Sequence, residues 1–202
     1  MQTMLFAIDR FSTIIGKLFA WSIVLLTIQV TYEVVARYAF SQPSQWGYDA
    51  SYMLYGTLFM MSGAYALARN GHVRGDFLYR KWPARTQAGM DLALFIIFFF
   101  PGILALVFAG WNFFRLSLAQ NEHSAFSPNG LLLWPFKLMI PVVGVMLIFQ
   151  GLAEVARCIV CLRTGAWPQR LSDVEELEVA IMERAAAERG EPQPAMPTAP
   201  RG

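Results

Sequence analysis

Residues 92–114, LALFIIFFFPGILALVFAGWNFF, form a run of 23 residues without a charged side chain. A helix needs about 20 mostly apolar residues to cross the hydrocarbon core of a bilayer, so this run predicts a transmembrane helix. Working outward from it, three further stretches of the chain also lack charged side chains: residues 18–32, 50–68 and 138–153.

The first and last of these stretches are short for a span, but a lysine borders each of them. Lys17 and Lys137 can lengthen the two spans, because a lysine stem can lie along apolar surface while its ammonium reaches the membrane interface. We therefore predict an all-α membrane protein with four transmembrane helices, near residues 14–36, 48–69, 91–115 and 135–160.

The composition of the whole chain agrees with a membrane protein. Hydrophobic residues make up 56% of the 202 residues and charged residues only 15%, against roughly a quarter charged in soluble domains. The formal net charge of +2 gives no electrostatic reason to expect nucleic acid as a partner. Two cysteines are too few for a disulfide framework. These numbers argue against a soluble, disordered or collagen-like chain.

The distribution of Lys and Arg predicts the orientation, because cytoplasmic loops of membrane proteins are rich in both. The segment between the second and third predicted spans is the most basic, with Arg69, Arg74, Arg80, Lys81 and Arg85. The N-terminal flank and the segment after the fourth span are also basic, whereas the other two loops are poor in Lys and Arg. Both termini are therefore expected in the cytoplasm.

The two ends of the chain differ from the membrane domain, which we expect at residues 14–162. Residues 1–13 have apolar side chains at helical spacing and lack a signal-peptide cleavage site, so they predict an interfacial amphipathic segment. A plain extension of the first span fits these residues equally well. Residues 163–202 predict a cytoplasmic acidic helix followed by a Pro-rich disordered tail.

The middles of the four predicted spans, near Val24, Leu58, Leu104 and Ile148, lack ionisable residues. A carrier that moves a polar solute by itself usually has such groups near the bilayer centre. Polar residues closest to these depths, such as Gln29 and Gln150, commonly join one helix to another by hydrogen bonds. The sequence thus indicates a membrane scaffold without a transport pathway of its own.

Charged residues gather instead at the ends of the predicted spans. Glu33 and Arg37, four residues apart, precede Trp46 and Asp49 on the outer side, while His72, Arg74 and Asp76 follow the second span on the inner side. These two clusters either anchor helix ends or form interaction sites. Glu154 and Arg157 are expected to neutralise each other at the inner end of the fourth span.

Cys158 and Cys161 raise an alternative, a four-span membrane thiol/disulfide oxidoreductase. Such chemistry needs further cysteines and an oxidising compartment, and this pair is expected on the reducing side, so a packing role is favoured. His72 and His123 are predicted on opposite sides of the membrane and cannot share a metal or haem. We expect no enzyme activity, cofactor or metal.

Several motifs, in order and with this topology, resemble a known family. They are Glu33 with Arg37-Tyr38-Ala39-Phe40, Trp46 with Asp49, GHVRGDFLY at residues 71–79, Glu122 with Ser124, GLLLWPFK at 130–137 and QGLAE at 150–154. Together they resemble the DctQ-type small membrane subunits of tripartite ATP-independent periplasmic (TRAP) transporters, in the mannitol/chloroaromatic-type branch. Asp49 stands where that family more often has Glu, and Gly75 replaces a usual Val or Ile.

The resemblance implies a small scaffold subunit in the bacterial inner membrane, with three partners: the large TRAP membrane subunit, a periplasmic substrate-binding protein and the lipid bilayer. In such a transporter the binding protein delivers an organic acid and the large subunit carries it by symport with an ion. For this chain the resemblance implies that Glu33, Arg37, Trp46 and Asp49 lie near a partner at the outer side, and that His72, Arg74, Asp76 and Tyr79 order the inner loop. Lys137 belongs to the matching motif that opens the fourth span.

Overall fold

The computed structural model describes residues 2–69, 79, 82–127 and 130–168. Almost all of them are helical. The elements are α1 (Gln2–Ala20), α2 (Ser22–Ala39), α3 (Gly47–Ala68), α5 (Ala84–Leu94), the π-helix η1 (Phe95–Phe99), α6 (Phe100–Ala119) and α7 (Trp134–Thr164). The expected acidic helix and tail beyond residue 168 lie outside the described residues.

Three continuous helical stretches of the described chain are long and apolar enough to cross a membrane: Gln2–Ala39, Ala84–Ala119 and Trp134–Thr164. They contain the predicted spans 14–36, 91–115 and 135–160, and each extends beyond them. The predicted span 48–69 coincides with α3, which has 22 residues but is not among the three. Its tyrosines, serines and glycines lower its hydropathy.

The first helical stretch has its only irregularity at Trp21, between α1 and α2. Residue 13 lies inside α1 without a break, so residues 2–13 continue into the first predicted span as one helix. At 1.5 Å per residue, a stretch of 38 residues is about 57 Å long, against about 30 Å for a hydrocarbon core. Part of this helix therefore extends beyond the core. Whether residues 1–13 lie at the interface stays a prediction.

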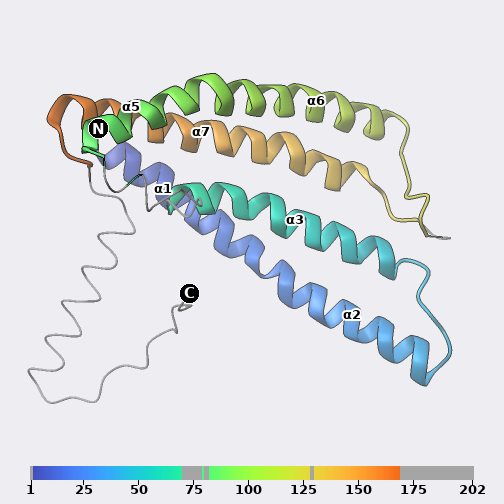
Figure 1. The fold of residues 1–202 in the computed structure, drawn as a ribbon. Coiled ribbons are helices and arrows are strands. Elements are labelled where there is room, and N and C mark those ends of the chain that lie inside the picture. Colours follow the sequence, from blue (N-terminus) through green and yellow to red (C-terminus); the bar gives the residue numbers. More distant parts are fainter. Residues whose placement is uncertain (1, 70–78, 80–81, 128–129, 169–202) are drawn as a thin grey trace, which may run out of the picture. The chain divides into compact units, whose positions relative to one another are not determined.

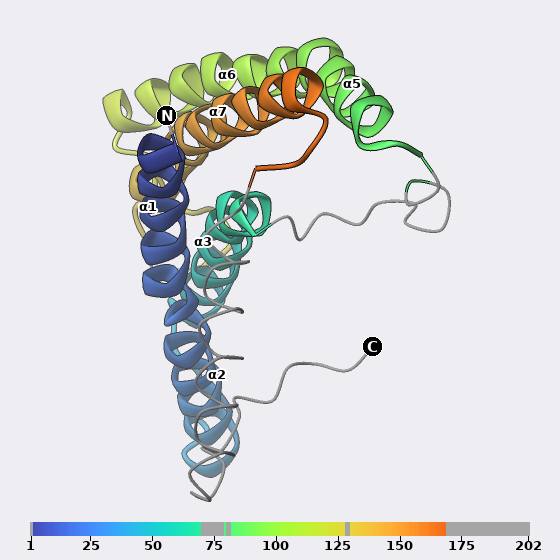
Figure 2. The ribbon, with the colours of Figure 1, turned by 90° about the vertical axis from the view of Figure 1, so that its left-hand side faces the viewer.

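Packing among the long helices follows the order α6, α7, α3, α2, as the two views of the ribbon show (Figures 1 and 2). α3 packs against α1 and α2 on one side and against α7 on the other. The contact between α3 and α7 holds a cluster of buried apolar side chains, comprising Met61, Ala64, Val143 and Met146. Because α1, α2 and α7 cover much of α3, this helix exposes less surface to lipid. It can therefore be less hydrophobic than the three long apolar stretches.

Glycines allow α6 and α7 to approach each other closely. A Cβ atom at Gly144 would lie 2.5 Å from Val107 Cγ2, and one at Gly151 would lie 2.5 Å from Phe99 Cε1. Small residues at such contacts are typical of membrane helix pairs, where close packing stabilises association. Phe99 ends the π-helix that precedes Pro101, whose missing backbone N–H interrupts regular hydrogen bonding.

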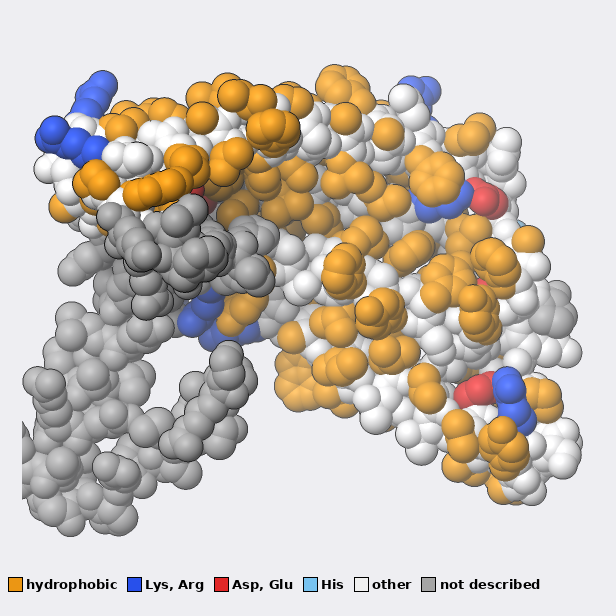
Figure 3. Space-filling model, viewed as in Figure 1, with side chains coloured by type: hydrophobic (Ala, Val, Ile, Leu, Met, Phe, Trp, Pro, Cys, Tyr) orange, Lys and Arg blue, Asp and Glu red, His pale blue; other side chains and the backbone are white. Residues whose placement is uncertain are grey.

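The outward faces of the helices are strongly apolar, and hydrophobic side chains cover much of α6, α3 and α2 in the space-filling view (Figure 3). The apolar window of the stretch Ala84–Ala119 has none of its residues buried in the chain, and that of Trp134–Thr164 has 44% buried. In water such surface would drive aggregation, whereas lipid or another membrane protein can cover it. The fold thus agrees with a membrane environment.

Candidate functional site

At the α2–α3 loop, Glu33 accepts several hydrogen bonds. We expect the helix ends at this loop on the outer side of the membrane and call them the outer ends. The Glu33 carboxylate takes one hydrogen bond from Arg37 Nη2 at 2.8 Å, one from the Ser44 backbone N–H at 3.1 Å and one from the Ser44 hydroxyl. The absence of a side chain at Gly47 makes room for these groups, since a Cβ there would lie 2.4 Å from Ser44 Oγ. The Glu33–Arg37 pair expected from the sequence is therefore present, and it also holds the α2–α3 loop.

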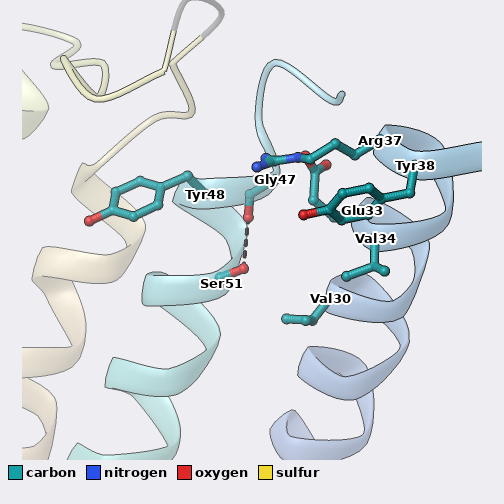
Figure 4. Close-up of a pocket in the computed structure, with 8 residues that line it drawn as sticks. All are labelled: Val30, Glu33, Val34, Arg37, Tyr38, Gly47, Tyr48 and Ser51. Atoms are coloured by element: carbon teal, nitrogen blue, oxygen red, sulfur yellow. Dashed lines mark hydrogen bonds and ion pairs between the residues drawn. The ribbon is translucent and has the colours of Figure 1, made fainter. Parts of the chain in front are cut away.

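One turn deeper, Gln29 joins α2 to the first turn of α3. Its amide donates to the Gly47 carbonyl at 2.9 Å and accepts from the Ser51 hydroxyl at 2.7 Å (Figure 4 shows Ser51 with Gly47). Trp46, at the start of α3, stacks on Tyr32 of α2 with ring centroids 6.2 Å apart. These contacts fix the outer ends of the two helices relative to each other.

Asp49 is completely buried at the start of α3. It accepts a hydrogen bond from the Ser124 hydroxyl at 2.6 Å and another from the Leu131 backbone N–H at 3.2 Å, both in the loop between α6 and α7. Both carboxylate oxygens thus bind groups of the same chain. Asp49 positions that loop and cannot itself touch a partner at the surface.

Lys137, in the first turn of α7, is also nearly buried. Its ammonium pairs with Glu122 and lies 3.7 Å from the centroid of the Phe113 ring, a favourable cation–π distance. The ammonium of Lys137 lowers the pKa of Glu122 below its ordinary value, because the hydrogen bond favours the carboxylate. Lys137 therefore joins α6, the α6–α7 loop and α7.

At the opposite end, a buried polar network joins α1 to α7. The Ser12 hydroxyl donates to the side-chain oxygen Oε1 of Gln150 at 3.0 Å. The side-chain nitrogen Nε2 of Gln150 donates to the Asp9 carboxylate at 2.8 Å. The Arg157 guanidinium pairs with Asp9 and with Glu154. None of these five side chains belongs to a residue more than 2% exposed. The expected Glu154–Arg157 pair is present, but it lies inside the protein and shares its cation with Asp9.

The sequence pattern placed Asp9 in an interfacial segment, so its part in this network was missed. The signal was present in the spacing. Asp9 and Ser12 are three residues apart on α1. On α7, Glu154 comes four residues after Gln150, and Arg157 comes three residues after Glu154. Each helix therefore carries a polar stripe on one face, and two such stripes can bind each other in an apolar environment.

Of the expected inner-loop residues, only Tyr79 is described. Its hydroxyl donates to Asp91 of α5 at 2.8 Å, and its carbonyl accepts from the Gln87 amide at 3.1 Å. Tyr79 therefore binds α5, at the start of the stretch Ala84–Ala119. His72, Arg74 and Asp76 lie outside the described residues.

Cys158 and Cys161 form no disulfide and are 1% and 0% exposed, where α7 packs on α5. They contact Ala88, and the Cys161 thiol donates to the Ala84 carbonyl at 3.6 Å. Within the described ranges, no group of three or more potential metal ligands is found. The surroundings of the two thiols are those of packing residues.

The charged contacts thus form two levels toward the two ends of the helices, which we name after the expected orientation. The uncharged Gln150 extends the inner network toward the middle of α7. Asp9, Asp91 and Glu154 belong to the inner level, and the outer level contains Glu33, Arg37, Asp49, Glu122 and Lys137. Between these levels, the described helices carry a single charged residue, the exposed Lys17.

The comparison with protein families matches residues 26–161 to the DctQ component of the tripartite ATP-independent periplasmic transporters. No curated protein is significantly similar to the chain in sequence. The family match spans most of the chain, including both polar levels apart from Asp9 and Ser12. DctQ proteins are transporter subunits and not enzymes, which rules out the oxidoreductase reading of the two cysteines. The chain belongs to the DctQ family of small membrane components of TRAP transporters.

Proposed function

We propose that this chain is the scaffold subunit of a TRAP transporter of the mannitol/chloroaromatic-type branch. It binds the large membrane subunit and supports ion-gradient-driven uptake of an organic acid that a periplasmic protein delivers. The observation that carries this proposal is the placement of charge: the buried charged groups described above bind other groups of the same chain at the helix ends. The helix middles that the structure describes offer no charged group inside the chain to bind a carboxylate substrate.

We further propose four spans in the bacterial inner membrane, with both termini in the cytoplasm. Helix α3 is the second span along the chain, in addition to the three long apolar stretches. Its 22 residues are enough for about 30 Å of hydrocarbon, and its position between α2 and α7 shields its less apolar residues. The Lys and Arg residues at positions 69–85 support the orientation, as do Arg157 and Arg163 in the last part of α7 and Arg170 after it.

The expected site residues take two kinds of role in this proposal. Glu33, Arg37 and Trp46 lie near the contact with the large subunit or the binding protein. Asp49 and Lys137, which are buried, act by positioning the outer loops. A further set of residues orders the inner loop against the large subunit: His72, Arg74, Asp76 and Tyr79.

The test is reconstitution in liposomes of three preparations: this chain alone, the large subunit alone and the two together. With the binding protein, the substrate and an ion gradient present, only the joint preparation should accumulate substrate. Arg74→Ala should lower uptake by weakening the complex, while the affinity of the soluble binding protein for substrate stays unchanged. Uptake by this chain alone would refute the scaffold role.

The cysteines provide a control that separates this function from thiol chemistry. Replacing Cys158 and Cys161 with Ala removes both thiols from a packed site, so some loss of stability is expected. Uptake per assembled complex should not change. A large loss of uptake with normal assembly would contradict a purely structural role.

A further inference from the structure

A groove opens between α2 and α3 at the outer polar level. Its cavity measures about 270 Å³. Val30 and Val34 line it on the α2 side, and Ser51 lies across from them on α3 (Figure 4). Glu33, Arg37 and Tyr38 line its outer end. Figure 4 shows the two valines one turn apart on α2, with Arg37 and Tyr38 beyond them toward the helix end. The groove is therefore amphipathic, with its apolar part directed toward the membrane interior.

Arg37 has unused hydrogen-bonding capacity at this place. Of its five N–H donors, one binds Glu33, and that contact is the only hydrogen bond that its side chain makes within the described part of the chain. The Arg37 side chain is 56% exposed. Tyr38 is 79% exposed, and its hydroxyl has no partner among the described residues. Both groups are free to bind a ligand at the mouth of the groove.

The depth of the groove matches the headgroup region of a bilayer. From Ser12 in the inner network to Glu33, the helix rises about 30 Å at 1.5 Å per residue, close to the thickness of a hydrocarbon core. Tyr32 and Trp46 stack at the same outer level, as aromatic residues do at membrane interfaces. A guanidinium placed there meets lipid phosphates, and the two valines meet acyl chains.

We propose that this groove binds one zwitterionic glycerophospholipid of the outer leaflet. The phosphate accepts hydrogen bonds from Arg37 and Tyr38, the headgroup ammonium lies toward Glu33, and part of one acyl chain packs on Val30 and Val34. The charge of the site decides the lipid class. Because Arg37 and Glu33 carry one charge of each sign, a headgroup with both signs complements them better than an anionic headgroup does. Naming the leaflet rests on the orientation given under the proposed function.

The size of the groove sets what it holds. With a volume of about 270 Å³, it is too small for a whole lipid and large enough for a segment of one acyl chain. The other side of that lipid remains free to face the bilayer or the large subunit.

The experiment uses the complex of this chain with the large subunit, delipidated in detergent and titrated while bound lipid is counted by native mass spectrometry. The probes are dihexanoyl phosphatidylethanolamine, dihexanoyl phosphatidylglycerol and the tail-free headgroup glycerophosphoethanolamine. We expect the ethanolamine lipid to bind at one site, several-fold more tightly than the glycerol lipid, and the tail-free headgroup to bind far more weakly.

Two variants test the two halves of the groove, each with a matched control. Arg37→Gln should weaken binding about tenfold, as expected for the loss of a charge-assisted hydrogen bond, whereas Arg115→Gln, an exposed arginine near the outer end of α6, should not. Val34→Trp fills the groove and should abolish binding at this site. Val35→Trp, on a residue of similar exposure (47% against 50%) outside the groove lining, should leave it intact.

Two results would overturn the proposal: equal binding of the tail-free headgroup, or unchanged lipid binding in Val34→Trp. The second result could come together with a loss of large subunit from the Val34→Trp complexes. That combination would mean that a side chain of the partner fills the groove. Co-elution of the large subunit, measured on the same samples, keeps this test separate from that of the proposed function. If the wild-type chain fails to co-elute, the same titration on the chain alone still decides the lipid site.

Discussion

The network that joins α1 to α7 leads to a prediction about stability that can be worked out from the structure. Arg157→Met keeps a long unbranched side chain but removes the guanidinium from Asp9 and Glu154. These two acidic residues are 1% and 2% exposed, so water cannot replace the lost cation. Removing one partner of a buried ion pair costs about 3–5 kcal/mol in other proteins. We expect the free energy of unfolding to fall by about that amount.

A second variant separates the effect of charge from the effect of packing. Combining Arg157→Met with Asp9→Asn and Glu154→Met removes all three charges, while the amide oxygen introduced by Asp9→Asn can still accept the hydrogen bond from Gln150. Replacing a whole buried ionic group by residues of similar volume is often close to neutral. The triple variant should therefore unfold within about 1–2 kcal/mol of the parent chain, despite carrying more substitutions.

The measurement is reversible unfolding by sodium dodecyl sulfate in mixed micelles, followed by the fluorescence of the chain's six tryptophans. Arg163→Met is the matched control, because Arg163 lies on the same helix but is exposed. Its effect should stay within about 0.5 kcal/mol. The reasoning is refuted if Arg157→Met costs no more than Arg163→Met, or if the triple variant is as unstable as the single one.

Two further predictions concern helix packing and pH. Gly151→Ala brings a methyl group into the Phe99 ring and should cost about 1–3 kcal/mol in the same unfolding assay. Gly102→Ala, whose Cβ meets open space, should instead stabilise α6 by up to about 1 kcal/mol. Equal effects of the two substitutions would contradict the tight contact of α7 with η1. The pKa of Glu122 lies below its ordinary value of 4.5, so its pair with Lys137 stabilises the fold above that pH, and this stabilisation is lost as the pH falls through the lowered pKa. Glu122→Gln should remove that part of the acid sensitivity, and an unchanged pH profile of unfolding would show that the pair contributes nothing.

The positions of the membrane helices could be predicted closely, but their ends could not. The uncharged run 50–68 and its flanks predicted a helix at 48–69, and α3 occupies Gly47–Ala68. The run 92–114 led to a prediction of 91–115, yet the helical stretch extends from Ala84 to Ala119. Hydropathy shows only where the uncharged run meets charged residues. The helix itself continues beyond that point while backbone hydrogen bonding is uninterrupted, and here it begins directly after Pro83.

The buried contacts of the polar residues were harder to predict. Glu33–Arg37 and Glu154–Arg157 are local pairs, at spacings of four and three, and the sequence indicated both. Asp9 and Arg157 are 148 residues apart, and Asp49 and Ser124 are 75 apart. Such pairs depend on which helices become neighbours. The spacing within one helix can show a polar face, as on α1 and α7, but it does not say which other helix that face binds.

The two polar levels also explain how helices arranged in this order can be stable. In a membrane, the apolar middles of the helices gain little by leaving lipid for protein, so packing and polar contacts decide which helices associate. The described chain has its long-range polar contacts at the helix ends, where Asp9 binds Arg157 and Asp49 binds the α6–α7 loop. It has close glycine contacts between the middles of α6 and α7. The outward faces of the middles carry neither feature and are left to lipid or to a partner, so substitutions there should affect assembly more than the stability of this chain.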